Sequence, residues 1–361
     1  MRLTAITRRR LVSQQIARAR FTTPAELVRW MGAVQAQDYL GSRWALGLRL
    51  PSALESEVEE AVAARTIVRT WPMRGTLHYA PAADVRWMLR LLTPRVIARS
   101  AGRYRELELD AATFQRAAKV LTRALEGRAL TRAEAYAALQ RGGVSPAGQR
   151  GIHILGHLAQ QGLICFGSRK GKQPTFVLLE EWLPPSRDLS REEALAILAE
   201  RYFRSHGPAT AHDFAWWTGL LLKDTQAAIA AAGPRLVAEP HDGRLLFSSV
   251  EARPAPGSRR TTAVLLPAWD EYLVAYKDRA AAFDPPSSRA DRVDAVGLAR
   301  VVIDGRVRGD WRRSLSSATV GVSVTFWNPV TRDERRAVEA AAERYGRFLG
   351  LRAQVETDVR R

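Results

Sequence analysis

Two stretches of this sequence repeat the same order of local signals, and this repetition limits the possible folds more than any other feature. Between 130 and 183, the capping pair Thr131 and Glu134 precedes helix-spaced apolar residues, a glycine-rich turn and a second helix-like run. Two strand-like segments, "GLICFG" and "TFVLLEEWL", follow and are joined by the basic stretch "SRKGKQP". A helix, a turn, a second helix and a hairpin with a basic tip form the order of a winged helix.

The same order returns between 190 and 250. Ser190 and Glu193 form a second capping pair, three helix-like runs follow, and "RLVAEP" and "RLLFSS" flank the tight-turn signal "HDG". The N-terminal part is less regular, but it has helix-like runs and the strand-like "RTIVRTWPMRGTLHYAP", which indicate a third unit with a distorted wing. We therefore predict an α+β fold of tandem winged-helix units, followed by a β-rich segment and a terminal helix that ends at Gly350. The predicted domains are 1–125, 126–188, 189–252 and, after a Pro/Gly/Arg-rich linker at 252–260, the C-terminal segment 260–361.

The charge balance of the chain indicates the kind of partner. Its 361 residues include 55 Lys and Arg against 37 Asp and Glu, a formal net charge of +18, which favours a polyanion. A membrane surface is the competing polyanion, but neither a lipidation signal nor a long basic amphipathic helix is visible, so we expect nucleic acid. The start lacks the apolar region of a secretory signal, and the longest apolar run, "FAWWTGLLL", is too short to span a bilayer. We expect a cytoplasmic monomer without a membrane partner.

Three groups of cations are candidates for phosphate contacts. Six arginines and no acid lie between 86 and 105, and two pairs of them have helical i,i+4 spacing on either side of Pro94, where we expect the helix to break. The other two groups lie on the predicted wing and on the C-terminal hairpin "DGRVRGDWRR". A solvated face is the alternative for each group, although solvated helices usually mix charges of both signs. The candidates are Arg86, Arg90, Arg95, Arg99, Arg169, Lys170, Lys172, Arg306, Arg308, Arg312 and Arg313.

Few residues suggest metal or acid–base chemistry. The single cysteine, Cys165, lies in an apolar run and is expected to be buried rather than reactive. His153 and His157 have i,i+4 spacing but no third ligand nearby, so we predict no metal site and no organic cofactor. Asp270 lies among aromatic residues, where a carboxylate acts in catalysis or, more often, pairs with an arginine. His78 is either a core histidine or a residue that faces a substrate.

The pattern "AVQAQD" places Gln35 and Gln37 at the end of a helix-like run. Residues two apart point away from each other on a helix but toward the same side in extended backbone. Gly41 and the polar residues after Gln37 indicate that the helix is ending, which permits the shared direction. The spacing alone leaves two interpretations, an amide pair that caps a helix end and a pair that acts together on a ligand.

A family resemblance bears on this choice. "AVQAQD", "RTWPMRGTLHYAPAADVRWML", "LLPAWDEYLVAYKDR" and "VIDGRVRGDWRR" together resemble the AlkZ-type DNA glycosylases, a winged-helix family that unhooks interstrand crosslinks, along roughly 8–350. The resemblance implies that the tandem winged helices form a basic concave surface and that Gln35 and Gln37 are the catalytic pair of the Gln-x-Gln branch. Asp38 lies one position too late to be the aspartate of the Gln-x-Asp branch. Asp38, His78 and Asp270 are then candidates for the substrate side.

The function that this resemblance implies is a monofunctional DNA glycosylase in base excision repair or in antibiotic self-resistance. Its expected partner is double-stranded DNA that contains alkylated guanine, with interstrand crosslinks as a further substrate. No lysine near the two glutamines is identifiable as a Schiff-base nucleophile, so an abasic site is the expected product. A non-enzymatic winged-helix regulator and a protein that sequesters the free alkylating compound are the alternatives, and neither requires Gln35 and Gln37.

Overall fold

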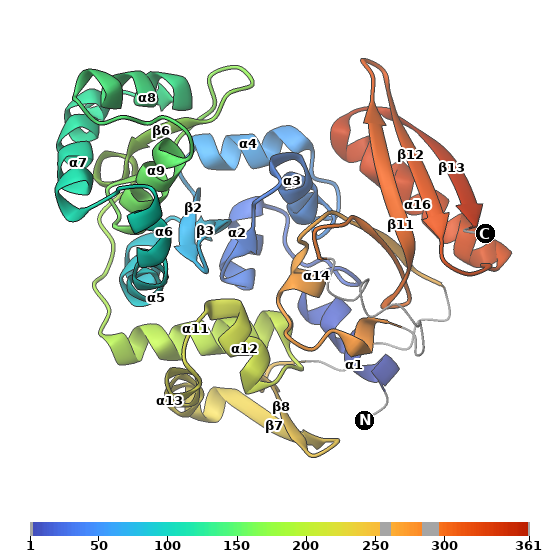
Figure 1. Ribbon diagram of the computed structural model, residues 1–361. Helices are drawn as coiled ribbons and strands as arrows, with labels where there is room; N and C mark the ends of the chain where they lie inside the picture. Colours follow the sequence, from blue (N-terminus) through green and yellow to red (C-terminus); the bar gives the residue numbers. More distant parts are fainter. Residues whose placement is uncertain (1–2, 253–260, 284–295, 360–361) are drawn as a thin grey trace. The chain divides into compact units, whose positions relative to one another are not determined.

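The structure is a computed structural model that describes residues 3–252, 261–283 and 296–359 (Figure 1). The chain divides into two compact units, each discontinuous in sequence. The first comprises Met1–Val58, Leu195–Trp217 and Leu221–Arg361, and the second comprises Glu59–Ala194 and Thr218–Leu220. Helices and sheets mix in both, in agreement with the predicted α+β class. The four predicted domains stay a prediction, and most of their linker, 253–260, lies outside the described residues.

A five-stranded sheet and one long helix form the C-terminal part of the first unit. The strand order is β13-β12-β11-β10-β9, and all neighbours are antiparallel except β12 and β13, which are parallel. Parallel neighbours need a crossover, and α16 (Arg332–Leu349) supplies it (Figure 1). The strands are β9 (Ala263–Leu266), β10 (Arg300–Ile303), β11 (Arg306–Leu315), β12 (Thr319–Phe326) and β13 (Arg352–Val359).

The sequence predicted a β-rich segment with a hairpin at "DGRVRGDWRR" and a terminal helix, in agreement with this sheet and α16. Gly350 ends α16 in the left-handed conformation as expected, and Asp304 and Gly305, both with positive φ, form the tight turn between β10 and β11. Strand β13 was not predicted. Its sequence "RAQVETDV" alternates exposed polar residues with half-buried ones, and Ala353, Val355 and Val359 pack against the core, so the period-two pattern was a signal for a strand that the sequence analysis missed.

The remainder of the first unit carries the site described below. Helix α3 packs closely on α16, because a Cβ added at Gly47 would lie 2.4 Å from the Phe348 ring. Hairpin β7–β8 turns at Asp242 and Gly243, as the "HDG" signal predicted. The elements are α1 (Leu3–Ser13), α2 (Pro24–Met31), β1 (Val34–Gln35), α3 (Tyr39–Gly47), most of α11 (Arg191–His206) and of α12 (Ala211–Thr218), α13 (Leu222–Ala232), η1 (Gly233–Arg235), β7 (Leu236–His241), β8 (Arg244–Ser249), α14 (Glu271–Val274) and η2 (Ala280–Ala282).

The second unit contains the stretch in which the repeated pattern is clearest. Thr131 and Glu134 form the expected capping box on α8, and α8, α9, β5 and β6 follow in the predicted order, with sheet order β4-β6-β5. The run "TFVLLEEWL" is only partly a strand, because its second half forms α10. The elements are α4 (Glu55–Ala63, which begins in the first unit), β2 (Ile67–Met73), β3 (Thr76–Pro81), α5 (Val85–Arg99), α6 (Ala101–Glu106), α7 (Ala111–Leu125), β4 (Leu130–Thr131), α8 (Arg132–Arg141), α9 (Arg150–Gln160), β5 (Ile164–Phe166), β6 (Thr175–Leu178) and α10 (Leu179–Trp182).

The expected break at Pro94 was wrong, because α5 continues through this residue. Proline removes one hydrogen bond from a helix, and Pro94 is exposed, where water can replace the missing partner. The hydroxyl of neighbouring Thr93 also donates to the Leu89 carbonyl at 2.7 Å, inside the same helix.

None of the described helices is long and apolar enough to be a candidate for spanning a membrane.

Candidate active site

Gln35 and Gln37 lie in the short connection between α2 and α3. Helix α2 begins with a capping box from Thr23 and Glu26, and it ends at Met31 because Gly32 takes a positive φ of 80°. The two-residue strand β1 follows. Asp38 then caps α3, since its carboxylate accepts from the backbone N–H of Gly41 at 3.1 Å. The predicted helix end is confirmed, and the pair lies in non-helical backbone that well-capped helices hold on both sides.

The two glutamines differ in their surroundings. Gln35 is 6% exposed, whereas Gln37 is exposed, and both have polar or electrostatic partners in the protein. Gln35 is therefore held by the protein interior, and Gln37 meets solvent. The shared direction of the two amides stays a prediction.

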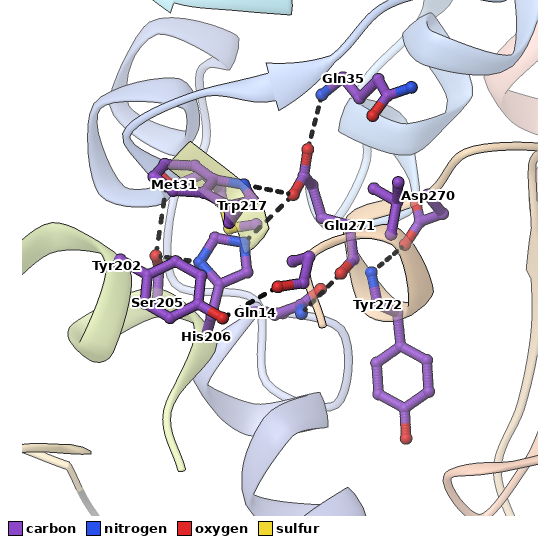
Figure 2. A network of polar contacts seen from close by, with 12 residues as sticks. Gln14, Met31, Gln35, Tyr202, Ser205, His206, Trp217, Asp270, Glu271 and Tyr272 are labelled. Atoms are coloured by element: carbon purple, nitrogen blue, oxygen red, sulfur yellow. Dashed lines mark hydrogen bonds and ion pairs between the residues drawn. The ribbon is translucent and has the colours of Figure 1, made fainter. Parts of the chain in front are cut away.

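A buried carboxylate holds the backbone of Gln35 (Figure 2). Glu271, the first residue of α14, is fully buried. Its Oε1 accepts from the backbone N–H of Gln35 at 2.7 Å, and its Oε2 accepts from the indole N–H of Trp217 at 3.0 Å. The His206 Nε2 lies 3.4 Å from the same Oε2. This contact was not predicted from the sequence, because the "WDEYL" run gives no local signal for it.

His206 extends this network toward the end of α2. Its Nδ1 lies 2.8 Å from the Ser205 hydroxyl, which is also 3.4 Å from the Met31 carbonyl, and its ring stacks on Tyr202 (Figure 2). Complete burial lowers the pKa of His206, and the contact with Glu271 opposes this effect only in part. The imidazole is therefore neutral near pH 7 and acts as a hydrogen-bonding group rather than as the counter-ion of Glu271.

Asp270, one of the three predicted substrate-side residues, contributes to the same support. Its two carboxylate oxygens accept from Arg49 at 2.7 and 2.8 Å, and both side chains are fully buried. Asp270 also caps α14 by accepting from the backbone N–H of Tyr272 at 2.9 Å (Figure 2). The expectation that this acid pairs with an arginine is confirmed, and a supporting role accounts for all of these contacts.

The other two predicted substrate-side residues also have structural contacts. The capping carboxylate of Asp38 lies 3.4 Å from the guanidinium of Arg313. His78, in β3 of the second unit, is fully buried, with Nδ1 3.0 Å from the Thr76 carbonyl and Nε2 3.3 Å from Arg74. These contacts favour the core alternative for His78.

Most of the cations predicted to contact phosphates form ion pairs within their own unit. The pairs are Arg86 with Glu180, Arg90 with Asp188, Arg169 with Glu59, Lys170 with Glu134, Arg308 with Glu334 and Arg313 with Asp38. Arg306 is half-buried and also has a partner. Arg95, Arg99, Lys172 and Arg312 are exposed and form no ion pair within the described part of the chain.

A second cationic surface was not predicted from the sequence. Arg116, Lys119 and Arg123 share one face of α7, and together with Arg141 of α8 they line a groove of about 460 Å³ that has no acid in its lining. All four side chains are exposed. Their i, i+3, i+7 spacing in the acid-free run "AATFQRAAKVLTRAL" is the signal that could have identified them. We call this surface the α7–α8 groove.

The described residues give no indication of a metal centre. They contain no group of three or more His, Cys, Asp or Glu side chains arranged to hold a metal. The His157 ring stacks on Phe114 with centroids 3.7 Å apart, and burial lowers its pKa to about 4. Cys165 is buried as expected, and burial raises the pKa of its thiol to about 12.

Comparison with known proteins gives consistent matches along most of the chain. Residues 28–348 match the model of the family described as DNA glycosylase AlkZ-like. A curated protein of Streptomyces sahachiroi, the interstrand DNA cross-link repair glycosylase, is 25% identical over 306 residues, covering 80% of this chain and 81% of that protein. The solved structure of Streptomyces sahachiroi DNA glycosylase AlkZ has a TM-score of 0.80 at 23% identity and covers 99% of both chains, which shows a shared fold.

Proposed function

The chain belongs to the AlkZ-like family of DNA glycosylases, and from this premise we propose that it hydrolyses the N-glycosidic bond of cationic N7-alkylguanines in double-stranded DNA. The products are the free modified base and an abasic site. Interstrand crosslinks through guanine N7 are a further substrate, because each end of such a crosslink is the same kind of adduct. The biological role is repair of alkylated DNA or self-resistance to a DNA-alkylating natural product.

The chemistry explains why neutral amides suffice. The alkylated base already carries a positive charge, so the bond between C1′ and N9 breaks with its electron pair moving to N9, without a general acid. An oxocarbenium-like sugar remains, and a water oxygen forms the new bond to C1′ while its proton passes to solvent. In this proposal the amide oxygens of Gln35 and Gln37 accept hydrogen bonds from that water and direct it. Their partial negative charge also favours the developing cation.

The observation that carries this proposal is the way in which the chain holds Gln35. Its backbone N–H is bound at 2.7 Å to the fully buried Glu271, while Gln37, two residues further on, reaches the surface. A catalytic group must be held within a fraction of an ångström, and a substrate as large as a duplex needs an accessible partner. The connection between α2 and α3 places a firmly held residue and an accessible one within three positions.

DNA binding in this proposal uses cations that form no ion pair within the described residues. We assign phosphate contacts to Arg95, Arg99, Lys172 and Arg312, which are exposed, and to the α7–α8 groove. The ion-paired candidates contribute less, because each must leave a carboxylate first. A lesion tethered to both strands cannot rotate freely into a deep pocket, so we propose a shallow approach in place of full base flipping.

A duplex with one 7-methylguanine tests the proposal directly. The protein is incubated with this duplex, and alkali then converts any abasic site to a strand break. Gln35→Ala and Gln37→Ala should each lose most of the activity while keeping their fold by circular dichroism and their affinity for DNA. Full activity of Gln37→Ala would remove this residue from the site. Sequence-selective binding without base release would favour a regulator.

A further inference from the structure

The buried Glu271 has no assigned role in the proposed reaction. We propose that Glu271 is the positioning residue of the site: its carboxylate fixes the backbone at Gln35 and so sets where the Gln35 amide meets the attacking water. This inference rests on the proposed function of Gln35. Glu271 is fully buried, so it acts through Gln35 rather than on the reacting atoms.

The contacts of Glu271 hold Gln35 directly and extend through His206 to Ser205, which lies beside the end of α2 (Figure 2). Its Oε1 holds the Gln35 N–H at 2.7 Å. His206 lies against Oε2 and bonds at 2.8 Å to Ser205, whose hydroxyl is 3.4 Å from the carbonyl of Met31, the last residue of α2. The Ser205 hydroxyl donates its one proton to the Arg201 carbonyl at 2.6 Å, so the hydrogen bonds that extend from Glu271 end in α11, and Ser205 packs beside Met31.

Glu271 is itself held rigidly. The Gln14 amide donates to the Glu271 backbone carbonyl at 3.2 Å. One residue earlier, Asp270 forms its buried pair with Arg49, and before that Trp269 has a φ of 57°, a left-handed conformation that a non-glycine residue adopts only when its surroundings impose it. A fixed support is what a positioning role requires.

The charge state of this position matters, because both oxygens accept from N–H donors. Replacing the carboxylate by the amide of glutamine keeps the shape but turns an NH₂ group toward either the Gln35 N–H or the Trp217 indole N–H. Two donors then face each other in a buried site, and the one oxygen that remains is a neutral and weaker acceptor, so the hold on the Gln35 N–H weakens in either orientation. Removing the indole donor as well should relieve this conflict and leave the amide oxygen free for Gln35.

The experiment compares Glu271→Gln with the double variant Glu271→Gln/Trp217→Phe in full-length protein. The first measurement is hydrogen exchange of the Gln35 backbone amide, and the second is the single-turnover rate of 7-methylguanine release at saturating enzyme. We expect Glu271→Gln to speed exchange at Gln35 and to slow release by about 100-fold with an unchanged Kd for DNA, as a small misplacement of a catalytic group does. The double variant should recover at least tenfold of this decrease.

Asp213→Asn is the matched control. Asp213 is a buried carboxylate of the same unit, 1% exposed, and it accepts from the backbone N–H groups of Thr210 and Lys277, both at 2.9 Å, without a contact to Gln35. Its replacement should lower the melting temperature without slowing base release from the folded enzyme. Equal slowing in both single variants, or no recovery in the double variant, would reduce Glu271 to a general core residue and overturn the inference.

The two proposals fail in different ways. If Gln35→Ala keeps the wild-type rate, the proposed function of Gln35 is wrong, whatever Glu271→Gln does. If Gln35→Ala is inactive but Glu271→Gln keeps both the wild-type rate and slow exchange at Gln35, only the positioning role is wrong. Hydrogen exchange does not depend on activity, so it tests the structural half of the inference by itself.

Discussion

Position 37 carries an amide. By the family resemblance, the other branch, Gln-x-Asp, has a carboxylate at this position. A carboxylate would stabilise an oxocarbenium-like sugar more strongly, which suits poorer leaving groups, whereas a neutral pair should restrict the enzyme to bases that leave as cations. We therefore expect wild-type protein to release 7-methylguanine but not uracil. Gln37→Asp should raise the rate for uracil relative to 7-methylguanine, both measured by single-turnover base release.

The control for this prediction is Gln37→Asn, which shortens the side chain by the same amount without adding charge. It should lower the rate for 7-methylguanine and leave the preference between the two bases unchanged. Release of uracil by the wild type at a rate close to that for 7-methylguanine would contradict the argument that a neutral pair selects cationic lesions.

His157 gives a prediction about stability and pH. Burial lowers its folded-state pKa to about 4, from an ordinary value of 6.5. As pH falls below 6.5 the unfolded chain takes up the proton first, so the free energy of unfolding decreases between pH 6.5 and 4 and is unaffected above 6.5. The contribution is at most about 3 kcal/mol.

His157→Gln removes the titrating ring and keeps a polar group near the hydroxyl of Tyr104, which lies 3.3 Å from His157 Nδ1. Urea denaturation of both proteins at pH 7 and pH 5 isolates this residue from other groups, because only the difference between the two pH dependences is used. The wild type should lose more stability than the variant on acidification. Identical decreases in stability would mean that the pKa of the ring is the same in the folded and the unfolded chain.

Helix α7 carries three exposed cations that were not among the candidates predicted from the sequence. Replacing Arg116, Lys119 and Arg123 with alanine should weaken binding to undamaged and damaged duplexes alike, because phosphate binding does not depend on sequence or lesion. The slope of log Kd against log salt should shrink by about 0.9 for each phosphate that is no longer neutralised. Fluorescence anisotropy at several salt concentrations measures both effects.

The matched control removes the same charge from cations that already have acidic partners. Arg187 pairs with Glu193, Arg244 with Asp278 and Arg347 with Glu343, and none of the three is among the predicted DNA contacts. Their triple alanine variant should keep the wild-type slope. If both triple variants lose affinity equally, net charge rather than the α7–α8 groove governs binding.

The elements that the sequence predicted well are those with local causes. The Thr131 and Ser190 capping pairs, the Asp-Gly turn of β7–β8 and the glycine end of α16 depend on residues at most a few positions apart. The predicted helix break at Pro94 was wrong, because the effect of a proline depends on whether water can reach the helix there. Strand β13 had a local signal that was missed, because "RAQVETDV" alternates polar and apolar residues.

The same distinction between local and distant causes applies to the residues of the site. A motif singled out Gln35 and Gln37 in the sequence, but Gly41, from which the helix end was predicted, lies inside α3, and the helix before the pair ends at Gly32. The hydrogen bond from Gln35 to Glu271 joins residues 236 positions apart, and no local pattern encodes it. The ion pairs of Arg86 and Arg90 were likewise invisible, since their acidic partners, Glu180 and Asp188, lie more than ninety positions further along the chain.

The net charge of +18 belongs to the whole molecule, and it leads to the last prediction. Release of counterions from DNA makes affinity depend on the number of phosphates contacted rather than on total charge. With about six contacts, affinity should fall by roughly 10³ between about 50 and about 200 mM salt. Anisotropy titrations on an undamaged duplex across this range give the slope directly. A flat dependence would mean that most of the 55 lysines and arginines neutralise the protein's own acids or face solvent, and that recognition depends on the lesion itself.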